Sequence, residues 1–378
     1  MLPLRISELE RVLSPGECAR GLPRAAYVDA AVFDFERAEL FRRWWWCVGR
    51  ECELSQPGEY LLATVAGEEL VVVRGADLEL RAFFNVCRHR GLPLVTAERG
   101  RSSELVCDYH GWAYELSGQL RRAPHMPGAF PRDCHGLRPV RVGVLHGFVF
   151  VCLDADAEAL SSALRGAPPW LTRPELLHLR LGRSVRYDVL ANWKLCIENF
   201  QESHHFARVH PALEALTPSA LATSWSGDGA WLGGHMPLAP HARSVSTQPE
   251  VEPKPWIVPD AERRRVSDAF AFPALLTSLQ PDYLLSYQLC PLEPARTRVT
   301  ANIYFHAAAF APNVEASHVY AFWDGVNAED RAICERQQRG VSSRSFEHAS
   351  YSLLEEGVQV FDQRMARHYL DAFDEKAV

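Results

Sequence analysis

Residues 85–95 have the sequence NVCRHRGLPLV, and residues 107–112 have the sequence CDYHGW. The first stretch contains Cys87 and His89, and the second contains Cys107 and His110. A glycine follows each histidine closely, which lets the backbone bend so that thiolate and imidazole point the same way. Two Cys–His pairs within one run of strand-like sequence indicate a metal site.

The arrangement of the two pairs distinguishes between two kinds of metal site. Zinc accepts two cysteines and two histidines tetrahedrally. A Rieske [2Fe–2S] centre takes two cysteines on one iron and two histidines on the other. Zinc fingers usually pair like with like, whereas each stretch here supplies one cysteine and one histidine. The mixed pairs favour the iron–sulfur cluster.

Composition indicates a globular protein with two domains. The chain has 378 residues, of which 47% are hydrophobic, and a net charge of −7. Its basic residues are dispersed, which argues against nucleic-acid binding and for a small-molecule substrate. The N-terminus has no apolar stretch of signal-peptide length and no long apolar run follows, so we expect a cytoplasmic protein without a membrane span. The ten cysteines are expected to be free thiols and metal ligands.

The pattern along the chain predicts an N-terminal segment (1–44), an all-β domain (45–155) and a larger C-terminal domain (156–378). β-rich runs with hairpin-type turns occur between residues 60 and 85 and between 143 and 153. A proline-rich connector at 165–175 marks the boundary.

Three features of the third segment lead to further predictions. Residues 282–292 and 298–309 are predicted to be two long antiparallel strands. Residues 236–260 contain six prolines, which predicts a long surface loop or lid. Apolar residues recur at helical spacing near the C-terminus and predict a core-facing stripe: Leu354, Val358, Phe361, Met365 and Tyr369.

A second cluster of metal-binding side chains lies in ENFQESHHFARVHP, residues 198–211. Two neutral imidazoles and one carboxylate form the facial triad of non-haem Fe(II) oxygenases, which leaves positions open for O₂. The stretch offers both residue types within thirteen residues: Glu198, Asn199, Glu202, His204, His205 and His210.

Both motifs resemble those of one family. CRHRG…CDYHGW resembles the cluster-binding signature of Rieske proteins, of the type that lacks a disulfide, and the second stretch resembles the motif E-N-x-x-E-x-x-H-x-x-x-x-H-P of Rieske-type non-haem iron oxygenase α subunits. The resemblance implies an α+β protein, with a Rieske all-β domain (45–155) and a catalytic domain (156–378) of helix-grip type, in which helices cover a curved antiparallel sheet. The N-terminal segment (1–44) is expected to pack on the catalytic domain.

The resemblance also implies the ligands of both metal groups. Cys87, His89, Cys107 and His110 would hold the [2Fe–2S] cluster, while His205 and His210 would bind a mononuclear Fe(II). The third iron ligand in this family is a carboxylate on a downstream helix. Residues 328–340, AEDRAICERQQRG, match that helix loosely and indicate Asp330, with Asp324 as its rival. His204 is not expected to be a ligand.

The resemblance further implies catalytic side chains and partners. Glu202 and Asn199 are the predicted catalytic residues, and Glu202 would join His205 to a neighbouring subunit's His110 in a homotrimer. Electrons would come from NAD(P)H through a separate reductase, and in some systems a ferredoxin, because the chain itself has no G-x-G-x-x-G motif after a strand. They would pass through the cluster to the iron, which uses O₂ to hydroxylate a small organic substrate.

The substrate is predicted from residues 281–299, PDYLLSYQLCPLEPARTRV. They resemble segments of the branch that removes a methyl group from quaternary amines such as glycine betaine, with release of formaldehyde. Seven aromatic residues of the catalytic half are available for a cation–π cage: Trp225, Trp231, Trp256, Tyr283, Tyr287, Tyr304 and Trp323. The alternatives are hydroxylation or dihydroxylation of an aromatic or natural-product ring, and a Rieske electron carrier without catalysis.

Overall fold

The chain forms two compact units in a computed structural model that describes residues 3–14, 20–227, 229–251, 255–310 and 316–377. Unit 1 consists of Met1–Leu40 together with Leu164–Val378, and unit 2 is Phe41–Ala163. Across the described ranges, no helix has both the length and the apolar composition that crossing a bilayer requires.

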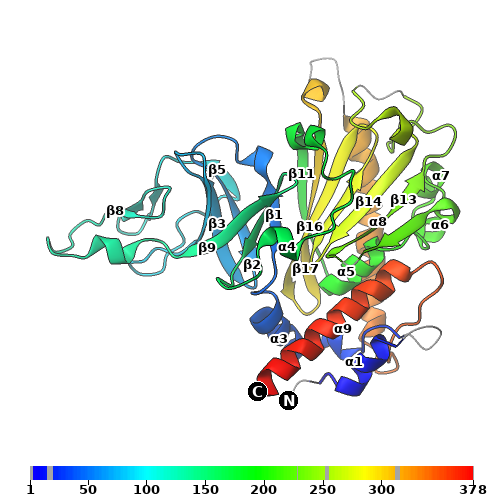
Figure 1. Cartoon of the computed structure of the whole chain (residues 1–378), viewed down its shortest axis with the longest axis horizontal. Coiled ribbons are helices and arrows are strands. Elements are labelled where there is room, and N and C mark those ends of the chain that lie inside the picture. Colours follow the sequence, from blue (N-terminus) through cyan, green and yellow to red (C-terminus); the bar gives the residue numbers. More distant parts are fainter. Residues whose placement is uncertain (1–2, 15–19, 228, 252–254, 311–315, 378) are drawn as a thin grey trace. The chain divides into compact units, whose positions relative to one another are not determined.

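Unit 2 is built almost entirely of strands (Figure 1). Its larger antiparallel sheet has the order β1-β10-β9-β4-β3-β2-β5, and a smaller one has the order β6-β7-β8. The strands are β1 (Trp46–Arg50), β2 (Glu59–Val65), β3 (Glu68–Arg74), β4 (Leu80–Phe84), β5 (Arg99–Arg101), β6 (Leu105–Val106), β7 (Ala113–Tyr114), β8 (Leu120–Arg122), β9 (Pro139–Leu145) and β10 (Phe148–Cys152), accompanied by η3 (Glu51–Glu53), η4 (Arg132–His135) and α4 (Leu160–Ala163).

The hairpins predicted for this unit are confirmed, and their turns explain the strand register. Ala66 and Gly67 link β2 to β3 with φ of 53° and 84°, and His146 and Gly147 link β9 to β10 with φ of 52° and 78°. Two consecutive residues with positive φ match the twist of the flanking strands. Each of these two strand pairs is therefore joined by a two-residue turn.

Unit 1 contains one antiparallel sheet of order β11-β17-β16-β15-β14-β13-β12. Its strands are β11 (Arg180–Val189), β12 (Thr223–Ser226), β13 (Trp231–Pro237), β14 (Arg265–Ala271), β15 (Leu275–Leu279), β16 (Tyr283–Glu293) and β17 (Arg296–Phe305). Its α-helices are α1 (Ile6–Val12), α2 (Ala25–Val28), α3 (Ala30–Phe35), α5 (Trp193–Phe200), α6 (Phe206–Val209), α7 (Pro211–Leu216), α8 (Ser317–Val341) and α9 (Glu356–Ala377), and short turns are η2 (Glu36–Leu40), η5 (Pro174–His178), η6 (Ser219–Leu221), η7 (Asp260–Glu262) and η8 (Ala307–Phe310). Long helices accompany the curved sheet (Figure 1), so the predicted α+β fold is confirmed.

A buried charge cluster ties the N-terminal segment to the rest of unit 1. Glu36 Oε1 lies 2.6 Å from Lys194 Nζ, and both side chains are fully buried. The indole of Trp193 donates to Glu36 Oε2 at 3.2 Å, and the phenol of Tyr369 donates to Glu36 Oε1. Because breaking a buried ion pair leaves an uncompensated charge, these contacts hold the start of α5 firmly in place.

The prediction of a surface loop at 236–260 is wrong for its central part. Ala242 and Val245 are fully buried, and the phenol of Tyr283 donates to the carbonyl of Val245 at 2.6 Å. The prolines interrupt any regular pattern, but small side chains with a hydrogen-bonded backbone are still packed inside the unit. Residues 252–254 of this stretch lie outside the described residues.

The C-terminal stripe is confirmed except at its first position. Val358, Phe361, Met365 and Tyr369 of α9 are buried, whereas Leu354 is 60% exposed because α9 begins only at Glu356. Figure 1 shows α9 beside α1, with which it is in contact.

The half-buried carboxyl group of Asp282 makes stability depend on pH. Burial raises the pKa of Asp282 to about 7, although a hydrogen bond from Ser244 opposes the shift. The native protein therefore holds a proton that an unfolded Asp loses near pH ~4. Its contribution to stability is complete below pH ~4 and is lost as the pH rises through 7.

We expect the substitution Asp282→Asn to remove this contribution to the pH dependence. The melting temperature of the variant, relative to that of the original protein, should rise between pH 5 and pH 8, as followed by circular dichroism. A constant difference across this range would contradict a raised pKa at Asp282.

Candidate metal centres

The two Cys–His stretches of unit 2 fold into two loops of matching geometry. In each, the cysteine amide donates to the carbonyl five residues later and the glycine amide donates back to the cysteine carbonyl, with N–O distances of 2.8 to 3.0 Å. Gly91 and Gly111 have φ of 83° and 68°. This left-handed conformation favours glycine and allows each loop to turn back on its own cysteine.

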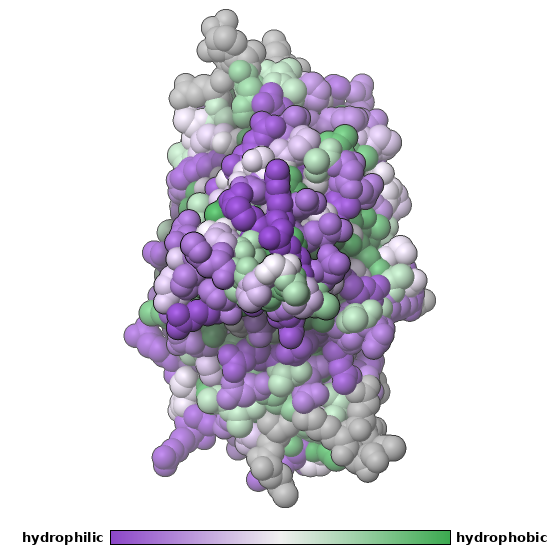
Figure 2. Space-filling view, turned by 90° about the vertical axis from the view of Figure 1, so that its left-hand side faces the viewer, coloured by the Kyte–Doolittle hydropathy of each residue, from purple (hydrophilic) through white to green (hydrophobic). Residues whose placement is uncertain are grey.

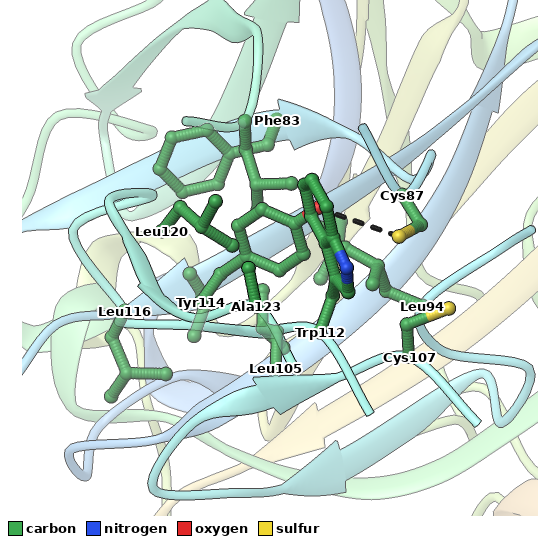
Figure 3. Packing of buried hydrophobic residues seen from close by; sticks show 13 residues of the cluster. Phe83, Cys87, Leu94, Leu105, Cys107, Trp112, Tyr114, Leu116, Leu120 and Ala123 are labelled. Carbon is green, nitrogen blue, oxygen red and sulfur yellow. Dashed lines mark hydrogen bonds between the residues drawn. The ribbon is translucent and has the colours of Figure 1, made fainter. Parts of the chain in front are cut away.

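The four predicted cluster ligands lie together at the edge of a hydrophobic core. Cys87 and Cys107 are 2% exposed, and Figure 3 shows both sulfur atoms on the same side of that core. Burial and the neighbouring thiol of Cys87 raise the pKa of Cys107. The rings of His89 and His110 are nearly perpendicular, with centroids 4.6 Å apart.

These residues fit a [2Fe–2S] cluster. The Nδ1 atom of His89 is buried and makes no hydrogen bond to any described residue, and both cysteines are free thiols. The phenol of Tyr114 lies 3.4 Å from Cys87 Sγ and accepts the amide of Arg88 at 2.9 Å. Hydrogen bonds to cluster sulfurs are one means by which proteins set a cluster's potential.

One cluster histidine faces solvent. His110 is exposed, whereas His89 stacks on Trp112 with 4.8 Å between ring centroids. Desolvation and the nearby His89 and Arg90 lower the pKa of His110. Tyr109 is 53% exposed next to it. The surface seen in Figure 2 is largely hydrophilic with scattered hydrophobic side chains.

A second group of metal-binding side chains lies in unit 1. Ligand atoms of His205, His210 and Asp330 all lie within 4.8 Å of one another. His205 immediately precedes α6 and His210 separates α6 from α7, while Asp330 is on α8. His210 Nε2 is 2.8 Å and His205 Nε2 is 3.7 Å from Asp330 Oδ1. Two imidazoles and one carboxylate match the facial triad.

The other nitrogen of each imidazole faces a second carboxylate. His205 Nδ1 lies 2.6 Å from Glu202 Oε1, and His210 Nδ1 lies 2.7 Å from Glu329 Oε2. Such partners fix the tautomer and direct Nε2 towards a metal. Since His205 Nε2 is buried without a hydrogen-bond partner among the described residues, the site fits a bound cation.

Electrostatics within this group are dominated by the carboxylates. Burial opposes protonation of His205, but the carboxylates of Asp330 and Glu202 raise its pKa to about 9. Burial would raise the pKa of Asp330, but His205 and His210 lower it to about 2. The carboxylate is therefore ionised at neutral pH.

The structure separates Asp330 from its rival. Asp324 is exposed and pairs with Arg183 at 2.9 Å, so it takes no part in this group. The amide of Asn199 donates to Asp330 Oδ1 at 2.7 Å, which brings that predicted residue into the site. The exposed side chain of His204 instead faces Ser352 at 3.4 Å.

Glu329 and most of the wall around the triad were not predicted from the sequence. The metal-binding group opens into a cavity whose walls are mainly aliphatic and aromatic. Of the seven aromatic residues proposed for a cage, only Tyr287 and Trp323 are among the described residues that line it, together with Tyr187, Phe200 and Phe206. Two sequence signals were available for these residues. Alternation of side chains along β11 could have indicated the cavity-lining position of Tyr187, and Glu329 directly precedes the predicted ligand Asp330.

Comparisons with known proteins agree with this geometry. The family "Ring hydroxylating alpha subunit (catalytic domain)" matches residues 176–371, and the family "Rieske [2Fe-2S] domain" matches residues 44–140. A glycine betaine monooxygenase oxygenase subunit from Pseudomonas aeruginosa is 27% identical over 365 residues, covering 88% of this chain and 84% of that protein.

Two further relatives are similar over nearly the whole chain. A carnitine monooxygenase oxygenase subunit from Acinetobacter baumannii is 26% identical, covering 92% of this chain and 94% of that protein. The crystal structure of the quaternary ammonium Rieske monooxygenase CntA with an inhibitor has a TM-score of 0.83 at 23% identity, covering 97% of this chain and 98% of that one. With a catalytic-domain match over more than half its length, this chain belongs to the family of ring-hydroxylating oxygenase alpha subunits, with a Rieske domain and a mononuclear non-haem iron domain.

Proposed function

We propose that this chain is the oxygenase component of a system that removes an N-methyl group from a quaternary amine. The observation that carries the proposal is the triad of His205, His210 and Asp330 at the wall of an apolar cavity. Aromatic side chains on that wall suit a cationic nitrogen. The similarity to glycine betaine and carnitine monooxygenase oxygenase subunits also supports the proposal.

We assign the two metal groups to the two units. Cys87, His89, Cys107 and His110 hold the [2Fe–2S] cluster in unit 2, and the triad holds the iron in unit 1. When bound, the cluster supplies electrons one at a time and the iron activates O₂. Glu202 and Glu329 keep the imidazoles in the tautomer that a metal needs, and Asn199 orients Asp330 through its hydrogen bond.

The proposed partners supply the electrons that the two metal groups of this chain use. A separate NAD(P)H-dependent reductase, with or without a ferredoxin, delivers electrons to the exposed side of the cluster, and the proteins meet in the cytoplasm. In the proposed homotrimer, Glu202 accepts a hydrogen bond from His110 of the partner subunit. This is supported by the exposure of His110 and by the lone pairs that Glu202 retains beside its bonds to His205.

The proposed reaction is tested with a panel of substrates and a surrogate reductase. For each turnover, one oxygen atom of O₂ leaves in formaldehyde and the other in water, while NAD(P)H supplies two electrons and the tertiary amine is released. We expect formaldehyde in proportion to NAD(P)H oxidised with quaternary amines. Hydroxylated product from aromatic rings, with no formaldehyde from any amine, would support the ring-oxygenase alternative instead.

Replacing the proposed third iron ligand should remove the mononuclear iron alone. We expect Asp330→Ala to lose about a third of the total iron, because two of three irons belong to the cluster, and to retain the cluster's visible spectrum. Asp324→Ala is the matched control on the same helix and should keep all the iron. Equal iron content in the two variants, measured by mass spectrometry, would exclude Asp330 as a ligand.

The proposed bridge is tested by the rate of electron transfer. We expect Glu202→Gln to keep both metal groups but to slow reoxidation of the reduced cluster by O₂ and substrate by about 10- to 100-fold, measured by stopped-flow in a single turnover. Glu329→Gln is the control, because it contacts His210 in the same way but lies outside the proposed bridge. Equal rates in the two variants would contradict a special role for Glu202.

A further inference from the structure

Three polar side chains form a corner in the otherwise apolar sheet wall of the cavity. Asp268 of β14 lies directly across the strand pair from Ser278 of β15, and Gln280 follows the end of β15. All three line the cavity, and the neighbouring lining positions on these strands are Val266 and Leu276. We call Asp268, Ser278 and Gln280 the polar corner.

The hydrogen bonds within the polar corner run in one direction. Ser278, opposite Asp268 in the strand pair, stabilises the ionised carboxyl group and so lowers its pKa, and Gln280 Nε2 donates to Ser278 Oγ at 2.8 Å. When Asp268 is ionised, the one hydrogen of the Ser278 hydroxyl goes to the carboxylate, so Gln280 presents its NH₂ to the serine. The ionised state of Asp268 thereby fixes the orientation of the amide.

This direction leaves acceptors unpaired at the cavity wall. Gln280 is 1% exposed, and its Oε1 has no hydrogen-bond partner among the described residues. Asp268 retains lone pairs that Ser278 does not use. Unpaired buried acceptors are costly, so a ligand group that donates hydrogen bonds is favoured at this corner.

The charges around the cavity also favour a hydrogen-bond donor over an anionic group at the polar corner. Burial raises the pKa of Asp268 to about 7, against the hydrogen bond from Ser278. An approaching cation would favour its ionised form, whereas a carboxylate would meet a negative charge. Among the described lining residues Arg331 is the one Lys or Arg, and its side chain is exposed.

The polar corner lies away from the iron triad along the sheet. Ser278 pairs with Leu285 of β16, and the next row that faces the cavity contains Tyr287. Tyr287 donates to Asn327 at 2.7 Å, and Asp330 lies almost one turn further along α8. About one turn before Asn327 on α8, Trp323 donates to Tyr283 at 2.7 Å. The paired residues Ser278 and Leu285 therefore lie further from Asp330 along the sheet than the paired residues Leu276 and Tyr287.

We propose that Asp268, Ser278 and Gln280 determine specificity by binding a hydrogen-bond-donating group, such as a hydroxyl, at the end of the substrate remote from the oxidised N-methyl carbon. The inference rests on the proposed N-demethylation and narrows it. The preferred substrates are quaternary amino alcohols, and amino carboxylates are disfavoured.

The test compares choline with glycine betaine, which share the trimethylammonium group and differ at the remote end. Dissociation constants are measured by calorimetry on the iron-loaded protein without reductase. We expect choline to bind about tenfold or more tightly than glycine betaine, and Asp268→Asn to reduce this ratio by about tenfold. Gln280→Leu should weaken choline binding and leave glycine betaine binding unchanged.

Asp282→Asn is the matched control. Asp282 is also a carboxyl group of raised pKa in the same sheet region, but it is absent from the described residues that line the cavity. It should leave the ratio unchanged. Tighter binding of glycine betaine, a ratio insensitive to Asp268→Asn, or no binding of either ligand would overturn the inference.

Turnover of the same two ligands separates this inference from the proposed function. Formaldehyde release without a binding preference overturns the polar corner and retains the N-demethylase. A binding preference that depends on Asp268, with no formaldehyde from any quaternary amine, overturns the N-demethylase and retains the recognition of donors.

Discussion

The carboxylate of Asp330 is the point at which three parts of unit 1 meet. It receives the amide of Asn199 from α5, faces His210 between α6 and α7, and is itself carried by α8. Its neighbours hold its pKa at about 2, so the negative charge is permanent under physiological conditions. Because these helices converge on one anion, their relative positions are set by the same group that would bind the metal. Loss of this charge therefore affects both the metal and the packing around it.

The surroundings of this anion suit a divalent cation. Glu202 and Glu329 add two carboxylates behind the two imidazoles, and no balancing Lys or Arg takes part in these contacts. A bound metal requires neutral imidazoles, and the three carboxylates then carry three negative charges in a partly buried site, which is unfavourable without the cation. A cation at the Nε2 side relieves this repulsion. The same carboxylates direct the imidazole nitrogens, so binding strength and geometry depend on the same hydrogen bonds.

Local spacing allowed prediction from sequence where the ligands are close along the chain. The loops at Cys87 and Cys107 and the pair His205 and His210 are each contained in a short motif, and the hairpin turns carry their own glycine signals. Glu329 was missed because its partner His210 is 119 residues away, and no local pattern specifies such a contact. The interior position of Ala242 and Val245 was missed for a related reason. It depends on a tertiary hydrogen bond from Tyr283 and not on hydrophobic periodicity.

Unit 1 is discontinuous in the chain, since unit 2 is inserted between Leu40 and Leu164. During synthesis, the residues of unit 2 emerge as one continuous piece and can fold while the ribosome is still producing β11. Glu36, in contrast, has left the ribosome long before Lys194 and Tyr369, its eventual partners, are made. The N-terminal segment therefore lacks the full set of these partners until α9, near the end of the chain, has been made. A translation system that stalls late thus yields nascent chains with a finished β framework and an unassembled oxygenase half.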